Sequence, residues 1–353
     1  MMFHFIIKRL WYGFSVLFGV IVVVFLLFHA LPGDPVAMMA GQRSDVATRE
    51  SIARELGLDQ PLHKQFLMYL NDLSPLSINK ISSKNEKKYE YRVLVRVGRD
   101  QAVVLKKPYL RRSFQTNKRV DEIIWKNAAS TFWLALAAMI FATTFGILFG
   151  ILAALKQNTF WDHFLILMSV LGISVPSFVA AVITAMVFGF YLSDYTGLNL
   201  TGQLWVNDPV HGRELHLENL ILPAITLGLR PMAIITQLTR SSMLEVLSSD
   251  YIRTAYAKGL RRRKVIFKHA LKNALNPVIT AVSGWLASLM AGAFFIEYIF
   301  DWKGLGYITI KAVQSLDFPV VMGMTLFIAM IFVIINIFVD VLYAAIDPRV
   351  RLN

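Results

Sequence analysis

Six long runs of apolar residues alternate with polar segments along the chain. Five of the runs contain no Asp, Glu, Lys or Arg, and the remaining run contains a single charged residue, Arg230. A helix of about 20 apolar residues crosses the core of a bilayer, and a charge at its centre costs about 2.5–3.5 kcal/mol on insertion scales. The pattern therefore predicts an all-α polytopic membrane protein with six transmembrane helices, over residues 11–31, 128–155, 164–193, 219–239, 278–296 and 320–339.

The first run has one feature of a secretory signal, because Lys8 and Arg9 precede it. Its apolar stretch is longer than that of a signal peptide, and no small-residue cleavage motif follows it. We therefore expect a membrane anchor that is retained.

The segments between the runs differ strongly in positive charge. If the N-terminus lies inside, the inside segments hold fourteen Lys or Arg residues and the two short outside loops hold three. Because positive residues collect in cytoplasmic loops, residues 1–10, the loop of residues 240–277 and residues 340–353 are predicted to be cytoplasmic. Residues 32–127 are also basic, but loops longer than about 60 residues do not report orientation reliably.

Residues 32–127 are predicted to form a small extracytoplasmic α+β region. Two segments with helical spacing, Arg49–Leu56 and Leu62–Leu70, flank a turn at Gly57–Pro61, and Pro61 opens the second helix. The polar, lysine-rich stretch Ser77–Lys88 predicts a mobile excursion.

A β-hairpin is predicted over residues 91–107 of this region. Valines alternate with Arg92 and Arg96 before a turn at Gly98–Gln101, and a second apolar stretch follows. An isolated hairpin is marginal in water, so we expect it to pack on the rest of the region or on a partner. A structural insertion without function is the alternative.

The composition narrows the chemistry that the chain can perform. With 56% apolar residues among 353, it has the composition of an integral membrane protein. The net charge of +13 is assigned to the loops and not to nucleic-acid binding, since no RNA- or DNA-binding motif accompanies it. There is no Cys, no GxxxxGK[ST] phosphate loop and no HExxH motif, and the seven His residues form no metal pattern. No cofactor or metal site is therefore expected in this chain.

The cytoplasmic loop has the pattern of two helices joined by a turn. Ser248–Asp250 are suitable N-cap residues, and Ile252, Ala255, Tyr256 and Leu260 recur at helical spacing. Gly259 is placed where a left-handed C-cap is expected, and Pro277 is expected to end the second helix. Periodicity alone leaves two interpretations open, a rigid lever fixed to two spans or an interfacial helix on anionic lipid.

This loop resembles the EAA loop of the membrane subunits of bacterial ABC importers, in the form found in dipeptide, oligopeptide and nickel permeases. The matching residues are Asp250–Ala255, Ala257–Leu260, His269–Leu271, Asn273, Ala274 and Pro277. Further matches lie in the family's order along almost the whole chain: Pro32–Pro35, Leu56–Pro61, Gln65, Tyr69, Ser174–Ser177, Leu222–Pro223, Thr239–Met243, Glu297, Phe300, Gly304–Gly306, Asp340, Tyr343 and Asp347–Arg349.

The order of the motifs and the long first external loop resemble the B-type subunit and not its C-type partner. The chain departs from the family at residues 74–108, which are longer and more basic than usual, and at Lys303, where Pro is common. The role of the basic insertion stays open.

The resemblance implies a transport subunit without covalent chemistry, in the bacterial cytoplasmic (inner) membrane. Such a chain forms a pore with a second, C-type permease. Two cytoplasmic ABC ATPases bind ATP and Mg²⁺, and an extracytoplasmic substrate-binding protein delivers the cargo. Membrane lipid surrounds the assembly, and no nucleic acid takes part. Peptides, nickel complexes and other small solutes share this scaffold.

The resemblance also implies which residues couple the chain to its ATPase: Tyr251, Ile252, Arg253, Ala255, Lys258, Gly259 and Leu260. On this hypothesis the helix docks in a groove of the ATPase, with Ile252 and Ala255 as its packing face. Arg253 and Lys258 pair with acidic residues of the partner. Closure of the ATPases pulls the helix, and the adjoining spans rock to open the pore outward.

Three residues are predicted to lie on the translocation path: Arg230, Ser174 and Pro176. Ionisable residues deep in a span usually face a cavity or a partner, so Arg230 is a candidate contact for a substrate carboxylate. Two alternative roles for Arg230 are an ion pair with another subunit and a side chain that extends to the membrane–water interface. Ser174 is not in a nucleophile elbow, and we expect it to satisfy the backbone near a kink at Pro176. Pro223 and Pro231 favour a kinked fourth span.

Two other classes of protein were weighed against an ABC permease. A secondary transporter would need a coupling-ion site and usually internal repeats, and the sequence offers neither. A membrane-embedded hydrolase would need a nucleophile or a metal set, which is also missing.

Overall fold

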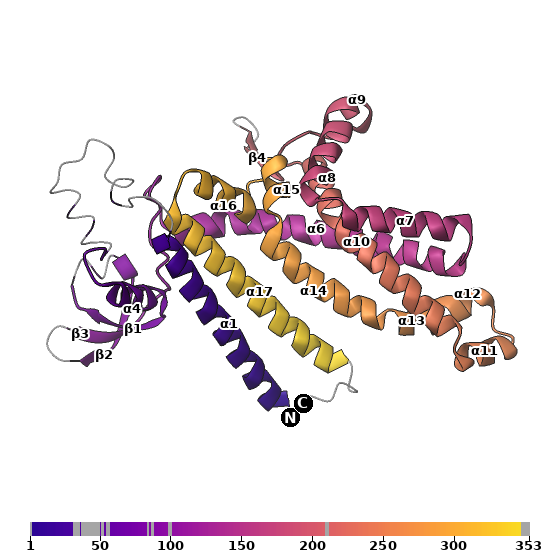
Figure 1. Cartoon of the computed structure of the whole chain (residues 1–353), viewed down its shortest axis with the longest axis horizontal. Coiled ribbons are helices and arrows are strands. Elements are labelled where there is room, and N and C mark those ends of the chain that lie inside the picture. Colours follow the sequence, from indigo (N-terminus) through magenta and orange to yellow (C-terminus); the bar gives the residue numbers. More distant parts are fainter. Residues whose placement is uncertain are drawn as a thin grey trace. The chain divides into compact units, whose positions relative to one another are not determined.

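The chain divides into two compact units in the computed structural model (Figure 1). The first, called the helical unit, comprises Met1–Leu17, Asn127–Ile310 and Ile328–Asn353. The second, called the sheet unit, comprises Phe18–Lys126 and Lys311–Phe327. The structure describes residues 2–30, 36, 50, 53, 57–82, 85, 88–97, 101–208 and 212–346.

Four helices run through both units. They are α1 (Met2–Ala30), α6 (Val120–Leu155), α16 (Leu305–Gln314) and α17 (Phe318–Ile346). The other elements of the helical unit are α7 (Phe160–Ser174), α8 (Ser177–Thr184), the π-helical turn η1 (Ala185–Tyr191), α9 (Ser193–Thr196), the antiparallel strands β4 (Trp205–Asp208) and β5 (Gly212–Leu215), α10 (Glu218–Leu247), α11 (Asp250–Ala257), α12 (Arg262–Lys264), the π-helical turn η2 (Val265–Ala270), α13 (Leu271–Ala274), α14 (Asn276–Gly292) and α15 (Phe294–Ile299).

Four helices in the described part of the chain are long and apolar enough to cross a membrane: Ile7–Ala30, Val120–Leu155, Glu218–Leu247 and Phe318–Val341. They coincide with the first, second, fourth and sixth predicted spans. α7 and α8 together supply a fifth if the bent pair counts as one span. The six predicted spans and the orientation with both termini inside therefore stay predictions.

The third predicted span, residues 164–193, is not one straight helix. α7 ends at Ser174, and the following helical segment runs at 108° to it. Pro176 has no amide hydrogen and disfavours a helical conformation in the residue before it. Val175 accordingly adopts an extended conformation with ψ 126°.

The fifth predicted span, residues 278–296, corresponds to two helices. α14 has 17 residues, fewer than the roughly 20 that a straight span needs. Ala293, with ψ 20°, separates it from α15.

Two spans are longer than the apolar runs that predicted them. α6 starts at Val120 and not at residue 128, because Val120 and Ile124 are buried and Asp121 and Glu122 suit a first helical turn. α10 continues to Leu247 and not to residue 239, so the predicted loop of residues 240–277 begins within this helix.

Small residues bring α6 and α10 into close contact. A Cβ atom added at Gly228 of α10 would lie 2.7 Å from the carbonyl oxygen of Ala138, and one added at Gly150 of α6 would lie 2.7 Å from that of Thr236. Glycine is needed at both places because the two backbones leave no room for a side chain. The apolar core continues from these helices onto α14 and α15.

A buried carboxylate links three helices of the same unit. Glu297 of α15 is fully buried and accepts a hydrogen bond from the hydroxyl of Thr131 in α6 at 2.7 Å. Its second oxygen accepts one from the amide of Tyr307 in α16 at 3.0 Å. The carboxylate thereby satisfies polar groups that would otherwise be orphaned in a buried place.

The sheet unit contains α4 (Leu62–Leu73) and a three-stranded antiparallel sheet. The strands are β1 (Leu76–Lys80), β2 (Arg92–Val97) and β3 (Gln101–Leu105), in the order β1-β3-β2. Leu76 lies opposite Leu105, and a bulge between Val93 and Val95 interrupts the pairing of β2 with β3. β2 and β3 correspond to the hairpin predicted over residues 91–107.

β1 contradicts the prediction of a mobile excursion from Ser77 onward. In this strand the polar residues Ser77 and Asn79 are buried, whereas the apolar residues Leu76 and Ile78 are exposed. This is the reverse of the usual alternation in a half-buried strand. Asn79 accepts a hydrogen bond from the side-chain amide of Asn71 in α4 at 3.1 Å. Polar contacts, not apolar ones, thus hold this strand, and a pattern of hydrophobic positions does not report them.

A polar cluster joins the sheet to α4. Asp72 of α4 accepts a hydrogen bond from the hydroxyl of Tyr89 at 2.7 Å. The ammonium group of Lys106 donates to the carbonyl of Asp72 at 3.2 Å and lies 4.0 Å from the centre of the Tyr89 ring. Burial lowers the pKa of Lys106 to about 8. The hairpin is therefore packed on the rest of its own region.

Other predictions are placed only in part. Gly57 has φ 72° and Pro61 immediately precedes α4, in agreement with the turn at Gly57–Pro61. Several predicted features lie mainly or wholly outside the described residues: Pro32–Pro35, Arg49–Leu56, the turn at Gly98–Gln101 and Asp347–Arg349.

Candidate functional site

α11 is a short helix closed by the turn that the sequence predicts. Ser249 occupies the N-cap position, and Gly259 has φ 74°. The amide of Gly259 donates to the carbonyl of Tyr256 at 2.9 Å, and the amide of Leu260 donates to that of Ala255 at 3.3 Å. These two bonds form a Schellman motif, which satisfies the last carbonyls of the helix. The left-handed conformation predicted for Gly259 is confirmed.

The apolar face of α11 is buried within the chain itself. Ile252 is 1% exposed and Ala255 is 7% exposed. Both belong to a cluster with residues of α6, α10 and the segment after α11: Ala154, Met243, Val265, Ile266, Ala270 and Ala274. The packing face expected for Ile252 and Ala255 therefore lies against the chain's own elements, and the coupling role given to these two residues stays a prediction. Leu260 is half-buried against the same cluster.

The opposite face of α11 is exposed and basic. Tyr251, Arg253, Lys258 and Gly259 are exposed, as predicted for residues that contact a partner. Tyr256 is exposed as well, although its spacing grouped it with the apolar residues Ile252 and Ala255, which are buried. Its position three residues after Arg253 puts it on the same face, and this spacing was the signal that could have identified it.

The basic face continues into the next segment. The four consecutive residues Arg261–Lys264 are all exposed. Figure 1 shows α11 and α12 at one end of the helical unit, beyond the ends of α10 and α13. A positive surface at the end of a helical bundle is suited to an acidic protein surface.

The second part of the loop differs from its prediction. It is divided into α12, η2 and α13, and Pro277 lies in the first turn of α14 and does not end a helix. Proline is tolerated there because the amide that it lacks would have no partner in the helix. The side-chain amide of Asn273 donates to the hydroxyl of Tyr251 at 2.8 Å, which ties α11 to α13.

A cavity of about 450 Å³ lies among α7, α8, α10, α14 and α15. Most of its lining is apolar, with hydroxyl groups from Ser177, Thr226 and Ser288. Arg230 also lines it, and no hydrogen bond or ion pair joins its guanidinium to any other residue that the structure describes. Such a cavity can accept a small solute with an apolar part and a carboxylate.

The predicted path residues are only partly brought together. Val175 and Ser177, on either side of Pro176, line the cavity with Arg230. Neither Ser174 nor Pro176 is among the residues that line the cavity. The hydroxyl of Ser174 donates to the carbonyl of Val170 at 2.8 Å, and a place for Ser174 and Pro176 on the translocation path stays a prediction. Pro223 and Pro231 lie inside α10, which continues through both as one helix of 30 residues.

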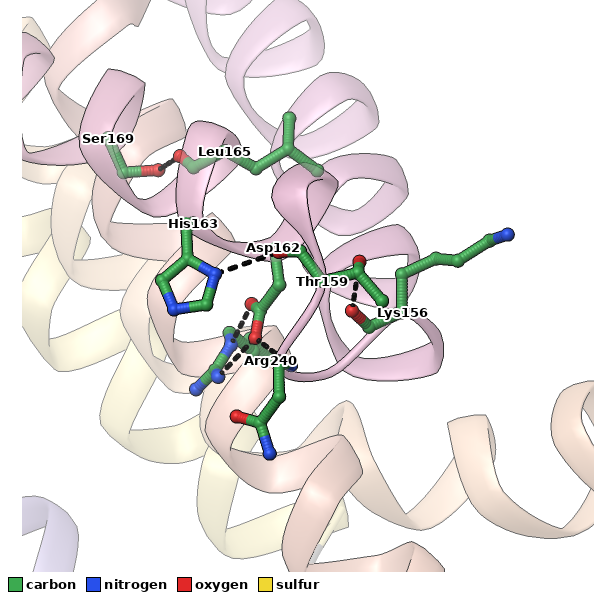
Figure 2. Close-up of polar contacts among 8 residues, drawn as sticks. Lys156, Thr159, Asp162, His163, Leu165, Ser169 and Arg240 are labelled. Carbon is green, nitrogen blue, oxygen red and sulfur yellow. Dashed lines mark hydrogen bonds and ion pairs between the residues drawn. The ribbon is translucent and has the colours of Figure 1, made fainter.

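The sequence analysis missed an ion pair between α7 and α10 (Figure 2). Arg240 donates from Nε to Oδ1 of Asp162 at 2.6 Å and from Nη2 to Oδ2 at 2.8 Å. The amide of Asn158 donates to Oδ2 at 2.9 Å. The side chain of Asp162 is 2% exposed. The available signal was the position of Arg240 in the Thr239–Met243 motif.

Metal-ligand side chains do not gather in the described part of the chain. No group of three or more His, Cys, Asp or Glu residues there could hold a metal ion. The geometry is that of a membrane protein with a solute-sized cavity and an exposed basic helix.

Two family descriptions match the chain. "Binding-protein-dependent transport system inner membrane component" matches residues 146–352. "Binding-prot-dependent transport system membrane comp, N-term" matches residues 2–83. The first match contains α10, α11 and the cavity.

Curated relatives match over nearly their whole length. The dipeptide transport system permease protein DppB of Alkalihalophilus pseudofirmus is 36% identical over 359 residues, which cover 98% of each chain. DppB of Escherichia coli K12 is 36% identical over 368 residues, 99% of each chain. The glutathione transport system permease protein GsiC of Escherichia coli K12 is 34% identical over 350 residues, again 99% of each.

A solved structure shares the fold. A chain of the inward-facing MetNI methionine ABC transporter superposes with a TM-score of 0.50 over 64% of this chain and 97% of its own. At 14% identity this similarity speaks for the fold alone. The family match and the full-length relatives show that the chain belongs to the binding-protein-dependent transport system inner membrane components, the membrane permease subunits of ABC importers.

Proposed function

We propose that this chain is one of two different pore subunits of an ATP-driven importer for short peptides. The observation that carries the proposal is the 36% identity to dipeptide permeases over 98–99% of both chains. A relative named for glutathione transport adds a second cargo of the same kind, since glutathione is itself a short peptide. The remaining subunits would be a C-type permease, two ATPases that hold ATP and Mg²⁺, and an extracytoplasmic binding protein.

The coupling step runs through α11. Its exposed face, with Arg253, Tyr256 and Lys258, binds the ATPase. Its buried face, with Ile252 and Ala255, is packed against α6, α10 and the segment after α11. A force on the exposed face therefore acts on those elements directly, and alternating access follows from their movement. The geometry favours the lever over a helix that only lies on lipid, because its apolar side chains are covered by protein.

The translocation path runs beside Arg230. A peptide carries a terminal carboxylate, and a guanidinium binds a carboxylate by two parallel hydrogen bonds. The free guanidinium in a largely apolar cavity of about 450 Å³ supports this role. The apolar walls would accept side chains without selecting among them.

Co-purification and reconstitution test the function. We expect a tagged chain to bring down a second permease and two ATPases. Vesicles that carry the complex with its ATPases inside, and its binding protein outside, should take up labelled dialanine only when ATP is present inside. Uptake that needs no ATP and follows an ion gradient would indicate a secondary transporter. ATP-dependent uptake of Ni²⁺ without dialanine uptake would keep the importer and reject the peptide cargo.

A further inference from the structure

A single carboxylate fastens the start of α7 to α10. Both oxygens of Asp162 are engaged, and its two bonds to Arg240 form the parallel fork typical of strong Arg–carboxylate pairs. The amide of Asn158 adds a bond from the turn that connects α6 to α7. Figure 2 shows the carboxylate directed at the guanidinium, with the turn at Lys156 and Thr159 beside it.

The pair is the directional contact between the two helices. Further along α7, Gly172 faces Leu229 and Ala233 of α10, where an added Cβ would meet atoms at 3.4–3.5 Å. Even an added methyl group would therefore fit there at ordinary van der Waals distance, so no interlocking side chain at Gly172 opposes small sliding movements. The two contacts are about 15 Å apart along α7, from ten residues at 1.5 Å rise. The ion pair therefore fixes the register, and the second contact does not.

The two helices lead to different functional parts. Arg240 lies ten residues before Asp250, the first residue of α11. α7 ends at the break next to Val175, which lines the cavity with Met168 and Leu171 of the same helix. The ion pair thus joins α10, which leads to α11 and also borders the cavity, to α7, which forms another part of the cavity wall.

We infer that Asp162 and Arg240 are positioning residues of the transport cycle, which make α7 follow α10 when α11 is displaced. Without the pair, α11 and α10 still move, but α7 slips and its part of the cavity wall does not follow. More ATP is then hydrolysed for each molecule transported. This inference rests on the proposed function, because it needs an ATPase that acts on α11.

The test measures ATP hydrolysis and dialanine uptake in the same vesicles, with the complete complex. For Asp162→Asn we expect normal assembly, hydrolysis close to that of the wild type, and about ten times more ATP consumed per peptide. Arg240→Lys keeps the charge but loses the fork, so an intermediate ratio is expected. Asp340→Asn is the matched control, since Asp340 pairs with Arg9 at 3.1 Å in a more exposed position and its removal should leave the ratio unchanged.

A reversible cross-link provides a rescue that a purely structural role would not show. The chain contains no Cys, so in the double variant Asp162→Cys, Arg240→Cys a short cross-linker that forms reducible disulfides reacts at no other position of this chain. We expect bridging to restore the wild-type ratio of ATP to peptide and reduction to abolish it again.

An unchanged ratio in assembled Asp162→Asn overturns the inference, and so does an equal loss of hydrolysis and uptake. If Asp162→Asn does not assemble, Arg240→Lys decides in the same way. If neither assembles, the pair serves folding and the inference is overturned as well. Failure of the wild-type complex to take up dialanine with ATP would instead reject the proposed function.

Discussion

Gly259 carries the left-handed turn at the end of α11, and its substitution tests the turn alone. An added Cβ would meet no atom within 4 Å, so a side chain is opposed only by the φ of 74°. A β-branched residue is strained there, at a cost of about 1–2 kcal/mol, whereas Asn tolerates it. We expect Gly259→Val to reduce co-purification of the ATPase and dialanine uptake, and Gly259→Asn to retain both. Equal behaviour of the two variants would show that the turn is not needed for coupling.

The role proposed for Arg230 predicts that uptake depends on the carboxylate of the cargo. A hydrogen bond to a charged group contributes about 1.5–3 kcal/mol, or roughly 10–150-fold in binding. We expect Arg230→Gln to lower uptake of dialanine by about that factor and to have little effect on dialanine amide, which has no carboxylate. Arg230→Lys retains a positive charge and should lose less. A similar loss for both substrates would exclude direct recognition of the carboxylate.

Lys106 makes the stability of the sheet unit depend on pH. Its pKa is lowered from 10.5 to about 8 by burial, so the unfolded chain binds more protons between these values. Stability therefore rises with pH over this window, and the contribution is lost as pH falls through 8. We expect the wild type to gain stability relative to Lys106→Met between pH 8 and pH 10, measured as thermal unfolding in detergent. A constant difference across this range would show that Lys106 titrates normally.

At the scale of the elements, the backbones of α6 and α10 approach each other closely at Gly150 and Gly228. A residue larger than Gly at position 150 would collide with Thr239 and with the carbonyl of Thr236. Overpacking of this kind costs about 1–3 kcal/mol. We expect Gly150→Val to lower the unfolding temperature in detergent. Gly19→Val is the control, since an added Cβ in α1 meets no atom within 4 Å, and an equal decrease in both variants would argue for helix propensity as the cause.

Most elements could be predicted, and the exceptions have local causes. Long apolar runs with at most one charged residue identified α1, α6, α10 and α17, because a segment that crosses lipid must be a long apolar helix. The break after Ser174 was expected only as a kink, since a proline indicates where a helix is disturbed but not how far its halves diverge. β1 was missed because its buried side chains, Ser77 and Asn79, are polar.

The turn at the end of α11 could be predicted from the sequence, but which face of the helix is buried could not. Gly259 was found because a glycine after a short helix has few other roles. The inward direction of Ile252 and Ala255 could not be assigned, since an apolar face fits a partner and the chain's own core equally well. Asp162 and Arg240 are 78 residues apart, and their pairing depends on how α7 packs on α10.

At the scale of the whole molecule, the basic surface of α11 and the following segment predicts how the chain binds its ATPase. The exposed basic residues of α11 and Arg261–Lys264 have few acidic neighbours in their own loop, which contains Asp250 and no other Asp or Glu between residues 250 and 277. We expect co-purification of the ATPase to weaken at high salt, because exposed charges are screened. Arg253→Glu should weaken it further and flatten the salt dependence, whereas Arg9→Gln should not. An unaltered salt dependence in Arg253→Glu would place the contact elsewhere.

The break between α7 and α8 brings two helix ends to the cavity wall, since Val175 and Ser177 both line it. A helix end carries main-chain carbonyl or amide groups that have no partner within the helix. A peptide presents the same two groups at every residue, whatever side chains it carries. On the proposed function, a wall that meets its cargo through such groups would treat all peptide sequences alike, and the choice among sequences would belong to the binding protein.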